Sequence, residues 1–148
     1  MKKIVAFVFC LFLVLNLSIP CLATRGEEII YSAQTELENG IICLDMITVS
    51  SSLLRSQDKT ATRSQTFLRD GTTIAEISIT GTFRYDGSTI SVVSKSISKC
   101  QTYDGWKFTQ SSFTSSGGTI TLTGTLSKLL LKTNVNISLS CDKDGNIS

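Results

Sequence analysis

The strongest structural signal in this chain is an unbroken alternation of apolar and polar side chains over residues 75–85. One parity holds Ala75, Ile77, Ile79, Gly81, Phe83 and Tyr85, and the other holds Glu76, Ser78, Thr80, Thr82 and Arg84. Because successive side chains of an extended strand point to opposite faces, this pattern predicts a strand with one buried and one wet face. Such a strand needs a second layer to cover its apolar face, so the chain must build packed β-structure.

Shorter runs of the same type recur along the chain, separated by turn signals. The turns are Asn39-Gly40, Asp70-Gly71, Asp86-Gly87 and Asp104-Gly105, and the runs are an edge strand around 29–31 and strands near 41–49, 59–68, 89–99, 106–113, 120–126 and 135–141. The parity of the apolar residues changes between Val92 and Val93, which predicts a β-bulge. We therefore expect an all-β protein, an antiparallel β-sandwich of immunoglobulin-like type with seven to nine strands.

The first residues have the pattern of an export leader. Lys2 and Lys3 precede an apolar run over 4–15, and Ala23 ends a segment with small residues at the positions that a signal peptidase reads. We predict a signal peptide over 1–23, cleavage after Ala23, and a single β-sandwich domain over 24–148. Lipidation of Cys21 is the alternative, but Pro20 does not fit the small residue required before a lipidated cysteine.

Charge and hydropathy exclude two classes of partner. The chain has 14 basic and 12 acidic side chains, so loss of Lys2 and Lys3 with the leader makes the two numbers equal. Nucleic-acid binders need a basic surplus, and none is present. No run of like charge exceeds two residues, and the apolar run is shorter than the roughly 20 residues of a permanent span, so we expect no stable membrane anchor.

Catalytic chemistry is restricted by the absence of histidine from the whole chain. Without histidine there is no Ser-His-Asp triad, no Cys-His pair and no histidine-ligated metal. The acidic residues show no spacing that pairs two of them, and Glu76 lies on the polar parity of its strand. We therefore expect a protein that is not an enzyme, with no cofactor, no metal and no catalytic residue.

The mature chain keeps three cysteines, Cys43, Cys100 and Cys141. In an exported protein an odd number of thiols predicts one disulfide and one free cysteine. All three pairings remain open, and buried apolar thiols are the alternative for each residue.

Two aromatic–acid turns supply the candidate ligand-binding residues, Tyr85, Asp86, Tyr103, Asp104 and Trp106. Aromatic faces beside carboxylates suit stacking on sugars or other rings. A single strand separates the two turns, however, so they are expected at opposite ends of the sheet, and Trp106 is expected in the core.

Two further segments have a possible binding role. Residues 142–146 begin like a calcium loop but lack the bidentate acid that completes one, so a solvated terminal turn is expected. The run Leu129–Leu131 lies between Lys128 and Lys132; it is expected to be a packed strand end, with an exposed docking tip as the alternative.

A set of short motifs gives the chain a family resemblance. In order these are Lys59-Thr60-Ala61-Thr62, Thr80-Gly81-Thr82-Phe83, Tyr85-Asp86-Gly87-Ser88, Trp106-Lys107-Phe108 and Cys141-Asp142-Lys143-Asp144-Gly145-Asn146. Over 44–148 the chain resembles a group of small secreted proteins of clostridia-like Gram-positive bacteria. The resemblance implies export from a bacterium and an all-β fold, and it transfers no functional residue.

These observations together predict a secreted bacterial protein that binds an extracellular glycan, cell wall or protein through loops at one end of its sheets. A secreted effector or bacteriocin-like polypeptide is the alternative, followed by a small hydrolase.

Overall fold

A computed structural model describes residues 26–50 and 57–148. The predicted signal peptide and most of the predicted connection after residue 50 lie outside these described residues. Within them every long element is a strand, and a single 3-10 turn, η1 (Glu38–Gly40), is the only helical segment.

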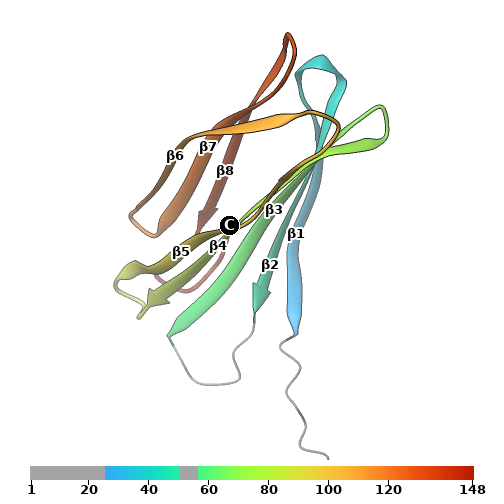
Figure 1. The fold of residues 1–148 in the computed structure, drawn as a ribbon. Coiled ribbons are helices and arrows are strands. Elements are labelled where there is room, and N and C mark those ends of the chain that lie inside the picture. The colour runs from blue at the N-terminus through green and yellow to red at the C-terminus, as the bar shows by residue number, and fades with distance from the viewer. Residues whose placement is uncertain (1–25, 51–56) are drawn as a thin grey trace, which may run out of the picture.

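In the described part of the chain, eight strands form two antiparallel sheets (Figure 1). They are β1 (Glu27–Glu36), β2 (Ile41–Ser50), β3 (Asp58–Arg69), β4 (Thr72–Tyr85), β5 (Ile90–Thr102), β6 (Lys107–Ser116), β7 (Thr119–Lys128) and β8 (Leu131–Ser140). The larger sheet has the order β1-β2-β3-β4-β5 and the smaller one β6-β7-β8. The predicted all-β, two-layer architecture is confirmed. The immunoglobulin-like refinement is not, because strands follow one another in sequence order within each sheet, whereas that fold uses Greek-key connections.

Tight turns join β3 to β4, which form a hairpin, and β5 to β6, which lie in different sheets. Asp70 and Gly71 have φ of 50° and 75°, and Asp104 and Gly105 have φ of 51° and 77°. Paired positive φ values match the right-handed twist of the flanking strands, and Asp followed by Gly adopts them at low cost. The Asp-Gly turns predicted from the sequence are confirmed at both positions.

The bulge predicted in the fifth strand is also confirmed. Thr82 pairs with Ser94 and Phe83 with Val92, so Val93 is the extra residue on β5. A second irregularity leaves out Ser98 between Ile97 and Lys99. Bulges bend an edge strand and increase its twist, and β5 leads from the larger sheet into the smaller one.

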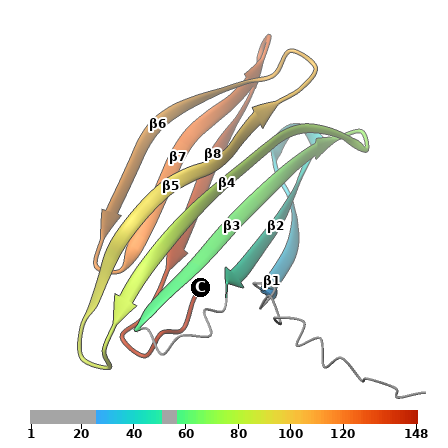
Figure 2. The ribbon, with the colours of Figure 1, turned by 60° about the horizontal axis from the view of Figure 1, so that its bottom comes forward.

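The core lies between the two sheets. Fully buried side chains from β4 and β7 supply its centre, among them Ile77, Ile79, Phe83, Ile120, Leu122 and Leu126. A Cβ on Gly81 would lie 2.3 Å from Cδ1 of Ile120, so the absence of a side chain lets the opposite sheet approach. The smaller sheet lies over β3, β4 and β5, and β1 and β2 extend beyond it (Figure 2).

Serine and threonine hydroxyl groups form rows on the larger sheet. On the outer face of the larger sheet, hydroxyls of neighbouring strands bond to one another at 2.8–2.9 Å, in the pairs Thr60–Thr82, Thr62–Thr80 and Ser64–Ser78. Cross-strand pairs of this type stabilise adjacent strands and leave the face hydrophilic.

The turns gather at the two ends of the sandwich. The β1–β2, β3–β4, β5–β6 and β7–β8 turns lie together at the top of Figure 1, and we call this the cavity end. The β4–β5 and β6–β7 turns and residues 141–148 lie at the opposite end.

The three cysteines form none of the predicted pairings, since Cys43, Cys100 and Cys141 are all free. Cys43 on β2 and Cys100 on β5 are separated by β3 and β4, about 14 Å at the usual strand spacing. Cys141 lies at the opposite end, where its amide donates to the Gly118 carbonyl. A disulfide needs Cα atoms within about 7 Å of each other, which explains why the expected bridge is absent.

This arrangement predicts the reactivity of the thiols. In the folded protein expressed from Thr24, only the exposed Cys100 is expected to react quickly with Ellman's reagent at mildly alkaline pH. Burial raises the pKa of Cys43 to about 11 and also raises that of Cys141, so both remain protonated and covered. Titration in guanidinium is expected to find three thiols, and Cys100→Ser to remove the fast phase. A single thiol in guanidinium would show that a disulfide forms after all.

Candidate functional site

The predicted aromatic–acid residues are divided between the two ends of the molecule. Tyr85 and Asp86 lie at the opposite end, and Tyr103, Asp104 and Trp106 lie at the cavity end. The separation expected from the intervening strand is therefore confirmed. Trp106 is 4% exposed and belongs to the core, as expected. These residues do not form a single aromatic platform.

Tyr85 has a packing role at the opposite end. A Cβ on Gly145 would lie 2.5–3.0 Å from three atoms of the Tyr85 ring, so the ring lies directly against this glycine. Asp86 is also committed locally: its carboxylate accepts from the amides of Ser88 and Thr89 at 2.9 and 2.6 Å. Both residues therefore shape the β4–β5 turn and its contact with the C-terminal segment.

The calcium-like segment 142–146 is a self-bonded loop. Asp142 Oδ1 accepts from the amides of Asp144 and Asn146, and Oδ2 accepts from the Asn146 side chain. The Lys59 ammonium group donates to the Gly145 carbonyl at 2.6 Å and ties the loop to β3. The loop is thus docked on the sandwich rather than freely solvated, and the Asp142 carboxylate serves the loop itself.

This loop predicts a pH dependence. The bonds from Asn146 hold the pKa of Asp142 below its usual value of 3.8. A depressed carboxylate pKa stabilises the fold at pH values above the unfolded pKa, and the contribution is lost as pH falls through the folded pKa. The Tm advantage of the natural chain over Asp142→Asn is therefore expected to be constant near neutral pH and to shrink below about pH 4. A pH-independent difference in thermal melts would contradict this.

Tyr103 and Glu76 form a polar cluster with Lys99. The Tyr103 hydroxyl donates to Glu76 at 2.5 Å, and the Lys99 ammonium lies 2.9 Å from the same carboxylate. These two bonds lower the pKa of Glu76, and the Glu76 carboxylate raises the pKa of Tyr103. Glu76 is thereby held ionised by a cation and a phenol, as in a structural ion pair, and no second carboxylate takes part.

An apolar cavity of about 520 Å³ opens at the cavity end. It is lined by Arg69, Asp70, Thr72, Ile74, Asp104, Trp106, Lys128, Leu129, Leu130 and Leu131. The buried side chains of Trp106 and Ile74 contribute its apolar interior, and charged groups of both signs stand around it. We call this the end cavity; of the candidate residues from the sequence, only Asp104 and Trp106 take part in it.

Two leucines project beside the end cavity. Leu129 and Leu130 form the two-residue turn between β7 and β8 and are 93% and 98% exposed. The expectation that this run packs is wrong for both residues, because the strands close at the Lys128–Leu131 pair and leave the turn beyond the core. Leu129 also has φ of 54°, a left-handed conformation that costs an ordinary residue about 1–2 kcal/mol. Strain and apolar exposure thus coincide at one turn.

A polar cluster between the sheets was missed by the sequence reasoning. The Arg63 guanidinium donates to Asp45 at 2.6 Å and to the Ser138 carbonyl on β8 at 2.5 Å, and it lies 5.7 Å from the centre of the Tyr31 ring. Gln65 and Asn39 donate to two further β8 carbonyls. These donors occupy the free edge of β8, which explains how that edge is protected. The cluster has a signal in the sequence. Asp45 on β2 and Arg63 on β3 are charged, although they stand at the alternate positions of their strands that are otherwise mostly buried.

Within the described residues, no group of three or more histidine, cysteine or acidic side chains is arranged to hold a metal ion. The same residues contain no helix long and apolar enough to cross a bilayer. No family model matches the chain, and neither the curated proteins nor the solved structures give a match.

Proposed function

We propose that this protein is a non-catalytic binding module, exported from a bacterial cell, that takes an apolar group of its partner into the end cavity. The observation that carries the proposal is the apolar interior formed by Trp106 and Ile74, open to solvent beneath two exposed leucines. Binding groups on loops at one end of a rigid sandwich are a common arrangement in β-proteins.

The size and chemistry of the cavity support a small apolar ligand group. Its volume of about 520 Å³ lies within the roughly 300–1,000 Å³ of typical ligand sites. Apolar walls supply the affinity in such sites, and a few charged groups orient the ligand. Among the charged groups around the cavity, Arg69 lies 3.9 Å from Asp70, so Lys128 is the cation that we expect to meet an anionic group next to the apolar one.

The position of the aromatic residues argues for insertion of an apolar group rather than for stacking on a glycan. Trp106 is covered, Tyr103 bonds to Glu76, and Tyr85 packs at the other end. Sugar binding by stacking needs exposed ring faces side by side. A protein or lipid partner therefore suits this end better than a polysaccharide.

Export and bacterial origin belong to the same proposal. They are supported by the leader pattern around Lys2 and Ala23 and by the resemblance to small secreted proteins of clostridia-like Gram-positive bacteria.

Decanoate, an apolar chain with a carboxylate, is a suitable probe, and Trp106 is the only tryptophan to report on it. We expect a saturable change in Trp106 fluorescence. Thr72→Phe, which places a ring at the cavity wall, is expected to weaken decanoate binding by about tenfold or more. The matched variant Thr114→Phe, at an exposed site on β6, should bind as the natural chain does. Equal weakening by both variants, or no saturation, would contradict the proposal.

A further inference from the structure

We propose that the partner at the cavity end is the surface of an anionic lipid bilayer, into which the Leu129-Leu130 turn inserts. The inference rests on the proposed function, because it names the partner of the same end of the sandwich. In this proposal the β7–β8 turn enters the acyl region of the bilayer. The lysines behind the turn contact the lipid headgroups.

The apex of this surface is apolar. Leu129 and Leu130 occupy the turn beyond the last strand pair, Lys128–Leu131, and expose almost their whole side chains. Removal of that surface from water favours transfer into any apolar medium within reach. Leu129 has a positive φ, and a hairpin turn of this type prefers glycine at such a position. The conformational preference of the turn therefore does not explain why the residue is a leucine.

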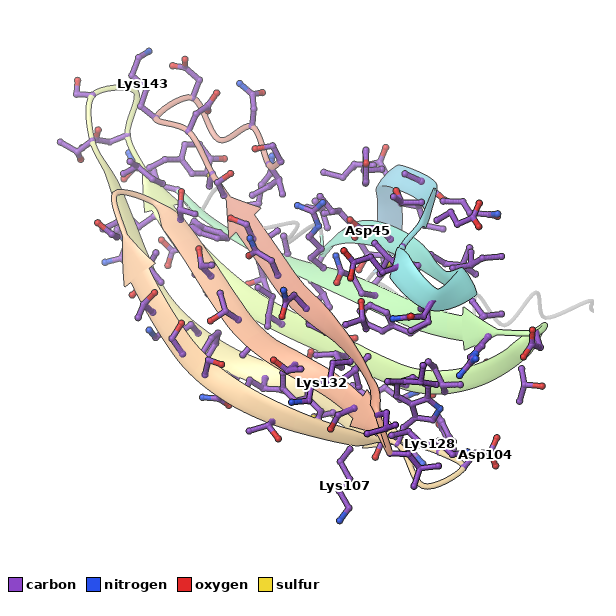
Figure 3. All side chains as sticks on the ribbon, turned by 90° about the horizontal axis from the view of Figure 1, so that it is seen from above. Asp45, Asp104, Lys107, Lys128, Lys132 and Lys143 are labelled. Carbon is purple, nitrogen blue, oxygen red and sulfur yellow. The ribbon has the colours of Figure 1, made fainter. Side chains whose placement is uncertain are left out.

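A collar of lysines stands directly behind the apex. Lys107 and Lys132 both lie opposite Ser127, on the two sides of β7, one row further from the turn than the Lys128–Leu131 pair. Lys128 is the last residue before the turn. Figure 3 shows Lys107 and Lys128 at this end of the molecule, on strands β6 and β7. Lysines in this position extend their apolar stems along an inserted turn and place the ammonium groups at anionic headgroups.

The acidic groups of this end, Glu36, Glu38, Asp70 and Asp104, all lie outside the three strands of the smaller sheet, although Asp104 and Lys128 line the same cavity. Asp70 and Asp104 belong to the β3–β4 and β5–β6 turns and line the end cavity together with Lys128. The charge complementarity to anionic lipid therefore resides in the smaller sheet, and we expect that sheet to tilt toward the membrane. Lys107 lies far from the other two lysines in the sequence, and three leucines separate Lys128 from Lys132, which is why no polybasic run marks them.

The shape of the apex favours a bilayer over a protein. A stable protein interface removes about 800 Å² from each partner, and a two-residue turn supplies only part of that area. A bilayer needs only insertion to the boundary between headgroups and acyl chains, about 5–10 Å deep. Two leucines with three lysines give a reversible attachment, comparable in kind to a single lipid chain aided by basic residues, and not a permanent anchor.

The test uses the protein from Thr24 and vesicles of equal parts phosphatidylcholine and phosphatidylglycerol, measured by co-sedimentation. We expect Leu129→Ser/Leu130→Ser to weaken binding by about tenfold or more. The control Ile29→Ser/Val93→Ser removes two other exposed apolar side chains and should change binding by less than about twofold. Lys107→Gln/Lys132→Gln and vesicles of phosphatidylcholine alone should each reduce binding, and brominated lipid should quench Trp106.

Decanoate binding and vesicle binding together show which of the two proposals fails. Decanoate binding without vesicle binding would overturn the bilayer proposal and leave the proposed function in place. Absence of both decanoate binding and vesicle binding would overturn the proposed function and the bilayer proposal. Equal vesicle binding by the leucine and control variants would also overturn the bilayer proposal. So would a dimer that depends on Leu129 and Leu130 without vesicle binding, since it would make a second copy the partner.

Discussion

Phe83→Ala is expected to lower the free energy of unfolding by about 3–5 kcal/mol, a large part of the stability of a domain this size. Phe83 is fully buried on β4, and its ring lies against Gly81, which Ile120 of the opposite sheet also approaches. Truncation removes the transfer free energy of the ring and leaves a cavity that the rigid sheets cannot close. Chemical denaturation with guanidinium measures the loss.

Val93→Ala is the matched control for this change. Val93 is the bulged residue of the adjacent strand β5 and is 50% exposed, so its truncation should cost less than about 1 kcal/mol. Similar guanidinium denaturation midpoints for Phe83→Ala and Val93→Ala would show that β4 does not face a second sheet.

Arg63→Ala is expected to lower the free energy of unfolding by about 2–3 kcal/mol, the second large effect. The variant leaves Asp45, only 13% exposed, without its cation, and removes the donor to the Ser138 carbonyl. A half-buried carboxylate that has lost its partner carries a desolvation cost with no compensation. The pair joins the larger sheet to the edge of the smaller one, so its loss also loosens the contact between layers.

Arg84→Ala provides a comparison with the same chemistry at the surface. Arg84 bonds Asp58 at 2.7 and 2.8 Å, but Arg84 is 60% exposed, so its removal should cost less than about 1 kcal/mol. The double variant Arg63→Met/Asp45→Leu is expected to recover much of the stability lost in Arg63→Ala, because no buried charge remains. Equal losses of unfolding free energy in Arg63→Ala and Arg84→Ala would contradict the role assigned to the polar cluster between the sheets.

Local patterns predicted the local structure well. The alternation in 75–85 became the strand β4, and the parity change at Val93 became a bulge. Asp70-Gly71 and Asp104-Gly105 became turns with positive φ. These features depend on neighbouring residues only, through the two-residue period of a strand and the conformations open to aspartate and glycine.

Long-range features were not predictable in the same way. The order of strands within each sheet depends on how two layers pack, and no local pattern distinguishes a meander from a Greek key. The expected disulfide failed for a related reason, because Cys43 and Cys100 lie on strands that two others separate. Sequence spacing carries no information about that distance.

The candidate site was predicted only in part. Asp104 and Trp106 were identified, but the end cavity also needs Arg69, Thr72 and Leu131 from the β3–β4 and β7–β8 hairpins. Leu129 and Leu130 were expected to pack, since leucines at a strand end normally do. Only the register of β7 and β8 shows that both fall in the turn itself.

The most direct test of the end cavity as the binding site is a methyl NMR spectrum of isoleucine-labelled protein, recorded while decanoate is added. The account predicts that the Ile74 methyl signal, within the cavity, shifts and saturates, and that the signals of Ile90 and Ile147, near the opposite end, stay in place. Shifts centred on Ile147, or no shift at Ile74 at saturating decanoate, would contradict it.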